Sequence, residues 1–305
     1  MLKVTVDMFS GRPNPEWIIT DQDVVEELMG AAAEAKAATA KPGAGFTGLG
    51  FREVLVSRLS DDPLRRRRGP REFALGSVAA EDLRASVDLA LRFVATMDRA
   101  QDITLVAHEL TPLTTRLRDL ILQRIERVLL SPGKIFPLTW PPYNPLRTTI
   151  PDDHCENCEY EVSQFNPGFW NTSAVQPYNN CYNYARNWRT DTFAQPGRAH
   201  GAKWTALTCP NVGTAAMADG LVKRCNCLPI EEWPRRLMAL VMDPGGDYHW
   251  YRHQRGGFWG HKPGGTAARN FDNSGNVIAN PETCDRGDYT EFCEYFYAGR
   301  SVVIN

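Results

Sequence analysis

The residue with the clearest chemical potential is a cysteine at the start of a short predicted helix. The stretch NNCYNYARNW places Cys181 directly after two asparagines, with Tyr184 and Trp188 at spacings that share its helix face. Asn180 is the natural N-cap of this helix. A thiol in the first helical turn lies near unpaired N–H groups and the positive end of the helix dipole, which favour the thiolate. The position predicts a nucleophile with a lowered pKa; a buried or disulfide-bonded cysteine is the alternative.

A histidine on a later strand is the candidate base for this thiol. The stretch RLMALVMDPGGDYHWYRHQ predicts an apolar strand, a Pro-Gly-Gly turn and an alternating strand that carries His249. The stretch FDNSGNVIANPE predicts a further hairpin, and it offers Asp272, or else Asn270 or Asn273, to orient the imidazole. His261 in FWGHKPG is a second candidate for the base. The chain order is therefore cysteine on a helix, histidine on a strand, and a polar residue after it.

The blocks NCYNYA and DYHWYR, with the strand that follows them, resemble the papain-like cysteine hydrolases of the NlpC type. In that family a helix carries the cysteine and packs against a sheet that bears the histidine and its polar partner. The resemblance covers about residues 179 to 298. It implies that Cys181 is the nucleophile, His249 the base and Asp272 the orienting group, with His261 in reserve. The same blocks, with ADGL and GHKPG, are also similar to a set of poorly characterised bacterial and fungal proteins.

The resemblance implies an enzyme, a thiol hydrolase or acyltransferase of the cysteine peptidase or amidase kind. Its thiolate would attack an amide bond in a peptide or peptidoglycan-like substrate, and backbone N–H groups at the helix start would bind the oxyanion. This mechanism requires no cofactor. Aromatic side chains are dense around these motifs, and those expected to contact the substrate are Tyr182, Trp188, Trp250, Tyr251 and Trp259.

The same aromatic density allows a function without chemistry. A non-catalytic module that binds peptide or sugar, or a toxin-like module, would need such a groove, and a loop-rich core would use the same side chains for packing. The substitution Cys181→Ala separates these alternatives, because an enzyme would lose turnover and a binding module would keep its function.

All eight cysteines lie in the second half of the chain. The stretches HCENC and RCNC offer four thiolates, enough for a structural tetrahedral zinc: Cys155, Cys158, Cys225 and Cys227. Disulfides among these four are the alternative, with a further short loop closed between Cys284 and Cys293. Cys181 and Cys209 would then remain. A bond between those two would exclude the nucleophile hypothesis.

A metal-dependent enzyme is a further class that the histidines allow. The candidate ligands are His249, His253, His261, His200, Asp247 and Asp272. Two imidazoles four residues apart on one straight strand are separated by about 13 Å, so His249 and His253 cannot share one ion without a bend. A site built from one of them and His261 is the workable version.

The elements that must position these groups fall into two expected domains, and the fold class is α+β. Residues 1–130 form a small amino-terminal α+β accessory domain, 131–153 a proline-rich linker, and 154–305 a papain-like domain of helix and antiparallel sheet. In the first domain, strands are expected at 2–6, 51–59 and 71–77, and helices at 24–38, 79–99 and 113–130.

Composition limits the partners and the compartment. The 305 residues carry a formal net charge of -2, which gives no reason to expect nucleic acid or an anionic membrane surface. The amino terminus has no uninterrupted apolar stretch of the signal-peptide kind, and no segment reaches the ~20 apolar residues of a spanning helix. We therefore expect a cytoplasmic protein, or one exported without an amino-terminal signal, that acts on a peptide-like partner.

Overall fold

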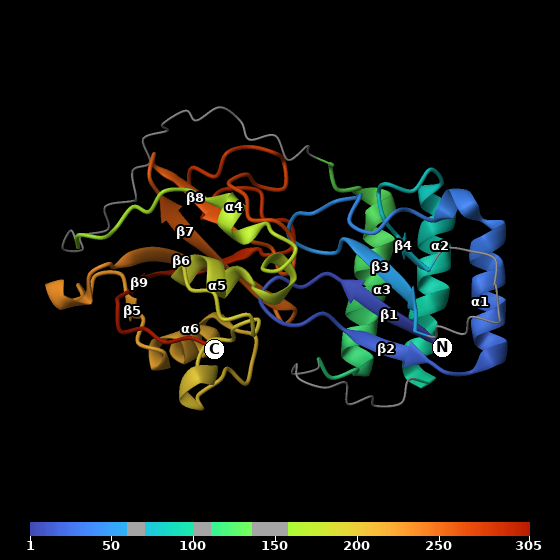
Figure 1. Ribbon diagram of the computed structural model, residues 1–305, viewed down its shortest axis with the longest axis horizontal. Helices are drawn as coiled ribbons and strands as arrows, with labels where there is room; N and C mark the ends of the chain where they lie inside the picture. Colours follow the sequence, from blue (N-terminus) through green and yellow to red (C-terminus); the bar gives the residue numbers. More distant parts are fainter. Residues whose placement is uncertain (60–70, 100–110, 136–157) are drawn as a thin grey trace. The chain divides into compact units, whose positions relative to one another are not determined.

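The computed structural model shows an α+β protein with two antiparallel sheets in different parts of the chain (Figure 1). The residues that the structure describes are 1–59, 71–99, 111–135 and 158–305. The chain divides into two compact units. Unit 1 comprises Met1–Met8 and Pro13–Phe136, and unit 2 comprises Phe9–Arg12 and Pro137–Asn305. The segment Phe9–Arg12, expected within the amino-terminal domain of residues 1–130, belongs to unit 2.

Unit 1 contains a four-stranded sheet in the order β2-β1-β3-β4. Its strands are β1 (Leu2–Asp7), β2 (Glu16–Ile19), β3 (Glu53–Arg58) and β4 (Glu72–Leu75). The apolar residues Leu2, Val4 and Val6 of β1 are buried, as strict alternation requires. The strands predicted at 2–6, 51–59 and 71–77 are confirmed.

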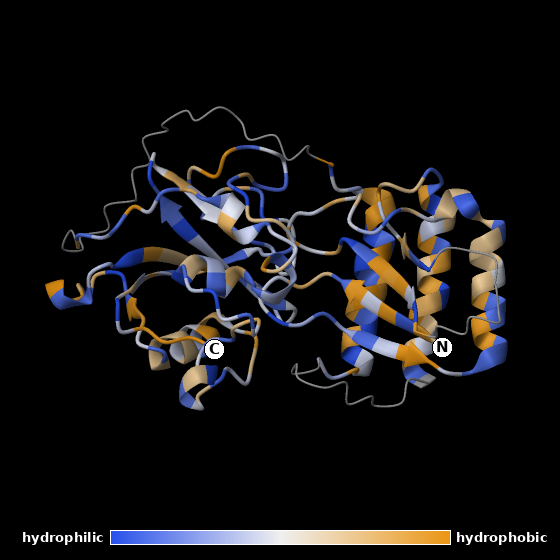
Figure 2. Ribbon diagram, viewed as in Figure 1, coloured by the Kyte–Doolittle hydropathy of each residue, from blue (hydrophilic) through white to orange (hydrophobic). Residues whose placement is uncertain are grey.

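Three α-helices complete unit 1: α1 (Gln22–Glu34), α2 (Leu83–Val94) and α3 (Thr115–Leu130). Side chains cap their amino ends, because Asp21, Asp82 and Thr114 each accept a hydrogen bond from a backbone N–H of the first turn. Short 3-10 turns follow α1 at Lys36–Ala38 (η1) and α2 at Ala95–Arg99 (η2). Figure 2 shows hydrophobic and hydrophilic residues interspersed along these strands and helices. Alternation predicted the strands, and apolar residues at helical spacing predicted the helices.

Unit 2 is built on a five-stranded sheet in the order β5-β9-β6-β7-β8. The strands are β5 (Val222–Lys223), β6 (Arg236–Asp243), β7 (Asp247–Gln254), β8 (Phe258–His261) and β9 (Glu291–Ala298). Every residue of β6 and β7 is buried, so both faces of these central strands are covered. The hairpin predicted from the Pro-Gly-Gly turn is confirmed.

The register of β6 and β7 separates the core of unit 2 into two faces. Leu240 lies opposite Trp250 on one face, and Val241 lies opposite His249 on the other. The helices α5 (Cys181–Arg186) and α6 (Cys209–Ala218) supply residues to the cluster that contains Leu240 and Trp250. The remaining short helices are α4 (Pro167–Trp170), η3 (Gln176–Tyr178), η4 (Arg198–His200) and η5 (Ile230–Glu232).

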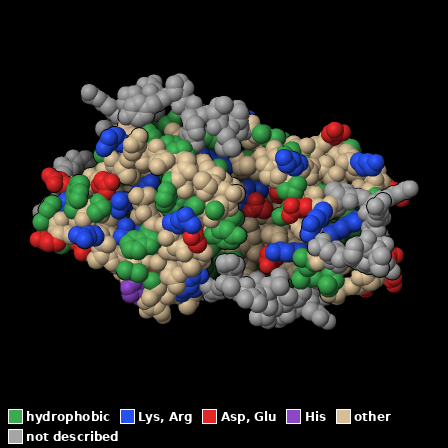
Figure 3. All heavy atoms as spheres, in the orientation of Figure 1, with side chains coloured by type: hydrophobic (Ala, Val, Ile, Leu, Met, Phe, Trp, Pro, Cys, Tyr) green, Lys and Arg blue, Asp and Glu red, His purple; other side chains and the backbone are tan. Residues whose placement is uncertain are grey.

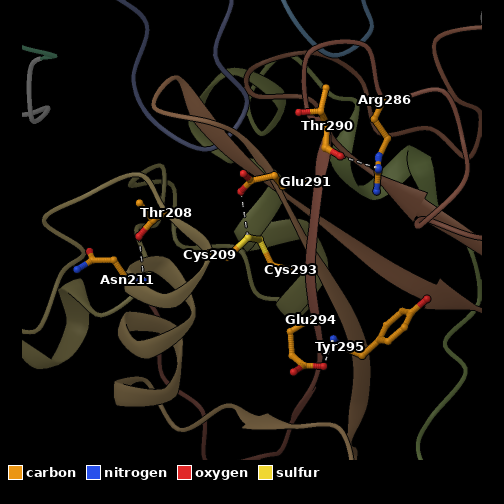
Figure 4. Close-up of a disulfide and its surroundings, with 9 residues drawn as sticks. All are labelled: Thr208, Cys209, Asn211, Arg286, Thr290, Glu291, Cys293, Glu294 and Tyr295. Carbon is orange, nitrogen blue, oxygen red and sulfur yellow. Dashed lines mark hydrogen bonds between the residues drawn. A yellow bond between two sulfur atoms is a disulfide. The ribbon is translucent and has the colours of Figure 1, made fainter. Parts of the chain in front are cut away.

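Two disulfides fasten the irregular parts of unit 2. Cys209, the first residue of α6, is joined to Cys293 of β9 (Figure 4), and Cys158 is joined to Cys227. Cys225 is also disulfide-bonded, and the free cysteines are Cys181 and Cys284. The expected Cys284–Cys293 disulfide is therefore wrong.

The cystines also correct the proposed zinc site. Zinc is bound by thiolates, and the sulfurs of Cys158, Cys225 and Cys227 are consumed in disulfides. Their fourth proposed partner, Cys155, lies outside the described residues, as does most of the expected linker at 131–153. In the part of the chain that the structure describes, no helix is long and apolar enough to cross a membrane.

Candidate functional site

The candidate site is centred on Asp247, the fully buried first residue of β7. Its carboxylate accepts hydrogen bonds from the backbone N–H groups of three consecutive residues: Ser10 at 2.5 Å, Gly11 at 3.0 Å and Arg12 at 3.2 Å. The hydroxyl of Tyr289 donates a fourth bond at 2.6 Å. Asp247 therefore holds the segment Phe9–Arg12 by its main chain rather than by its side chains.

The charges at this point compensate one another. Burial raises the pKa of Asp247, while the positive charge of Arg12 and the hydrogen-bond donors act in the opposite direction. Burial likewise lowers the pKa of the Arg12 guanidinium, and the charge of Asp247 opposes that shift. The guanidinium also lies 3.7 Å from the centre of the Phe9 ring. Segment and carboxylate thus form one buried unit, in which each charge depends on the other.

The carbonyl oxygen of Gly11 is the second anchor of the segment. It accepts hydrogen bonds from Asn180 Nδ2 at 2.7 Å, Gln195 Nε2 at 2.8 Å and the Tyr248 hydroxyl at 3.0 Å. Asn180 is also the N-cap of α5, as predicted, so one side chain both starts the helix and binds the segment. A Cβ added at Gly11 would lie 2.6 Å from Cδ2 of Tyr248, which explains why this position is glycine.

A line of hydrogen bonds runs from the segment through two buried histidines. Ser10 Oγ lies 2.5 Å from His249 Nδ1, His249 Nε2 lies 2.9 Å from His261 Nδ1, and His261 Nε2 lies 3.0 Å from the carbonyl oxygen of Phe271. A carbonyl only accepts, so His261 carries its proton on Nε2. His249 then donates from Nε2, and Ser10 donates to His249 Nδ1. This assignment holds for a neutral His261, whose Nδ1 accepts the hydrogen bond from His249.

Burial lowers the pKa of His261 to about 3, with a smaller contribution from the charge of Arg269. The hydrogen bond to Phe271 opposes this shift only in part. Because the site excludes water, a neutral His261 is its stable form at neutral pH.

The structure brings Cys181 close to this line but does not activate it. Burial raises the pKa of the Cys181 thiol well above its usual range, and the charge of Asp247 raises it further. The lowered pKa expected from the helix dipole is therefore wrong, since desolvation outweighs the dipole. The Ser10 hydroxyl interacts with the thiol, and both ring nitrogens of His249 are engaged by Ser10 and His261. The sequence analysis identified Cys181, His249 and His261 as candidates, but it did not identify Ser10 or the rest of the segment Phe9–Arg12 that contacts them.

Asp272 has a different role from the expected one. Its carboxylate accepts hydrogen bonds from the backbone N–H groups of Ser274 at 3.0 Å, Asn276 at 2.9 Å and Asp285 at 3.1 Å. These bonds hold the turn that the sequence predicted around Asn273-Ser274-Gly275. The ring of His249 is instead fixed by its own partners described above.

Four of the five expected substrate-binding aromatics belong to the core. The side chains that are at most 1% exposed are Tyr182, Trp250, Tyr251 and Trp259. A ligand could reach them only if the core opened, so their expected role in substrate binding is wrong. Trp188 is 44% exposed and is the remaining candidate of that set.

Of the histidines proposed as metal ligands, His249 and His261 are hydrogen-bonded to each other, whereas His253 and His200 have other partners. His253 lies 3.2 Å from the Tyr160 hydroxyl, and burial lowers its pKa to about 4. His200 pairs with Asp219 at 3.0 Å. Across residues 1–59, 71–99, 111–135 and 158–305, no group of three or more His, Cys, Asp or Glu residues could hold a metal ion.

Several residues of the site carried no signal in the sequence. Ser10 lies 239 positions from His249, and Gln195 binds Gly11 across 184 positions, so no local spacing relates them. Lys262 is fully buried and donates to the carbonyl oxygens of Gln176, Asn179 and Gly264. The sequence indicates Asp247 only as a possible metal ligand, whereas its carboxylate binds backbone N–H groups. The stretch SGRPNP, which contains most of the segment, could have drawn attention to it, because Gly, Pro and Asn are typical of turns.

Fold and site define an α+β protein whose disulfide-bonded second unit holds a segment of chain in a buried polar receptor. No family model and no solved structure matches the chain. It is 43% identical over 143 residues to "Insoluble matrix shell protein 1" of Ruditapes philippinarum, in an alignment that covers 47% of this chain and 95% of that protein. The chain belongs to the family of that matrix protein.

This relative corrects the expected activity. The match is to a protein named as an insoluble matrix shell protein, and this finding contradicts the classification as a hydrolase or thiol protease. The buried, protonated thiol of Cys181 agrees with that correction. The likeness of fold to NlpC-type domains stays a prediction.

Proposed function

We propose that this protein is a non-catalytic structural component of an insoluble extracellular matrix. The observation that carries the proposal is the 43% identity to the matrix protein along 95% of its length. Sequence identity at this level over a whole protein generally preserves the fold, and a structural role depends on the fold rather than on a few reactive groups. The non-catalytic module among the sequence-based alternatives is the version that this supports.

The cystines support export, in place of the expected cytoplasmic location. Disulfides persist in oxidising compartments and are rare in the cytosol. Cys158–Cys227 and Cys209–Cys293 close loops of 69 and 84 residues of sequence separation, so they are cross-links between distant parts of the fold. Such cross-links suit a protein that must persist outside the cell without repair.

The surface supports organic rather than highly charged partners. Lysine and arginine side chains are interspersed with aspartate and glutamate over the face shown in Figure 3, and the net charge is only -2. On that face the described side chains do not form the extended patch of one charge sign that concentrates ions or nucleic acid. Peptide or sugar components of the matrix are therefore the proposed partners.

Sequential extraction of the producing tissue tests this proposal. Extracellular material would be washed with salt, then detergent, then denaturant, and finally denaturant with a reductant, and each fraction would be probed with an antibody to this chain. We expect the protein in the residue after detergent, released only by denaturant or reductant, with oxidised cysteines. A cytosolic enzyme followed in parallel serves as the control. Recovery of the chain in the cytosolic fraction with reduced cysteines would refute the proposal.

A further inference from the structure

We propose that unit 2 also accepts the segment Phe9–Arg12 from a second copy of this chain, so that chains join by exchanging this segment. The inference goes beyond the proposed matrix role, because it names a chain-to-chain contact that operates in solution as well. It begins from the receptor around Asp247, which binds a peptide main chain.

The receptor binds the segment through both its backbone and its side chains. It engages the three successive N–H groups of Ser10, Gly11 and Arg12, the carbonyl oxygen of Gly11 and the hydroxyl of Ser10. Receptor and segment residues are separated by 169 to 239 positions in the sequence, so none of these bonds relies on local chain continuity. An identical segment from another molecule would form the same bonds, which is the principle of domain swapping.

The segment is presented as the tip of a hairpin. Strands β1 and β2 pair antiparallel, and the hydrogen bond from Val6 N–H to the carbonyl of Pro15, 2.9 Å, continues the ladder beyond them. Met8 N–H donates to Asn14 Oδ1 at 3.0 Å, which closes the base of the loop. The base of this hairpin belongs to unit 1, whereas its tip belongs to unit 2. The base of the loop is thus held by hydrogen bonds within the hairpin itself.

An empty receptor would be less stable than an occupied one. Asp247, Asn180 and Gln195 are fully buried with the segment in place, and without it they would exchange these hydrogen bonds for bonds to water. The receptor is therefore more stable with a segment, either its own or that of another copy, and the concentration of chains decides between them.

Exchange of this kind allows closed dimers and open assemblies. Each chain has one segment and one receptor, so reciprocal exchange between two chains closes a two-fold symmetric dimer, whereas one-way exchange from chain to chain is heterologous. Heterologous contacts continue into chains unless the geometry closes a ring. A protein that polymerises in this way would become insoluble without any change in its fold.

The experiment uses the full chain with its disulfides intact. The chain would be unfolded in urea and refolded at low and at high protein concentration, and molar mass would be measured by light scattering after gel filtration. We expect monomers at low concentration and a series of dimers and larger species at high concentration. A wild-type chain that is monomeric at every concentration would overturn the proposal.

Two variants separate the segment from the receptor. Gly11→Val should prevent the segment from binding, because the valine side chain would clash with Tyr248. Asp247→Asn should weaken binding by the receptor, because it removes the charge that accepts the hydrogen bonds of the segment. We expect neither variant to assemble alone. Mixed before refolding, they should give heterodimers that do not grow, since the pair holds one intact segment and one intact receptor. Growth of either variant alone to the wild-type size distribution would contradict the exchange.

A peptide competition covers the case in which a variant fails to fold. The peptide MFSGRP, residues 8–13, would be added during refolding of the wild type, and the matched control peptide would carry valine in place of glycine. We expect only the first peptide to suppress association. If wild-type chains associate equally with both peptides, another surface mediates the contact and the proposal fails. The extraction experiment is independent, because a chain can enter a matrix through other partners.

Discussion

Removal of the Cys209–Cys293 disulfide should destabilise unit 2 by several kcal/mol. The two cysteines are 84 positions apart, so the cross-link restricts a large loop in the unfolded chain. The chain-entropy relation gives about 4.5 kcal/mol for a loop of this length at 25 °C. The free energy of unfolding of a whole domain is only about 5–15 kcal/mol. The double variant Cys209→Ser/Cys293→Ser should therefore lose a large part of it.

Urea unfolding followed by tryptophan emission measures this effect. Trp250 and Trp259 are buried in unit 2, so the change in their emission reports its unfolding. The matched control is Cys284→Ser, which removes a free, half-buried thiol and should change the free energy of unfolding by less than about 1 kcal/mol. A double variant that unfolds within about 1 kcal/mol of the wild type would refute the reasoning, as the cross-link would then not restrict the unfolded chain.

Three further predictions follow from the burial of single residues. The folded pKa of His261 is about 3, below the ordinary 6.5, so the unfolded chain binds more protons between these pH values. The free energy of unfolding therefore falls as the pH drops through this window, by up to about 1.4 kcal/mol per pH unit. Urea titrations at pH 7 and pH 5 should show a smaller loss of this free energy in His261→Asn than in the wild type. Iodoacetamide at neutral pH should leave Cys181 unlabelled in the native protein and label it after unfolding, and rapid native labelling would contradict its raised pKa. Trp250→Ala should cost about 3–5 kcal/mol in thermal or urea unfolding because it empties a core position, whereas Trp188→Ala, at an exposed position, should cost less than about 1 kcal/mol.

Local patterns predicted much of the fold. The alternation of apolar residues located β1, and the Pro-Gly-Gly turn located the hairpin of β6 and β7. The strand that carries His249 also followed from alternation, and Asn180 was recognised as an N-cap from its residue type. These features depend on a few neighbouring residues, so the sequence alone contains them.

The site depended on distant contacts that no local pattern records. Cys181 was judged by its helix position, but its burial decides its chemistry, and burial arises from tertiary packing. The pairing of Cys209 with Cys293 likewise could not be chosen from the spacing of eight cysteines. Ser10 entered the site from the opposite end of the chain. The residue types were therefore identified more successfully than their partners.

The position of Phe9–Arg12 has a consequence for how the chain is made. Ribosomes release the amino terminus first, yet this segment finds its binding partners 237 positions later, at the start of β7. Unit 1 can begin to fold before the residues that bind its hairpin tip have been synthesised. Contacts of such long range form late, because the entropy of closing the loop is lost before they are gained. The docking of this tip would accordingly be among the last steps of maturation, after the core of unit 2 has assembled.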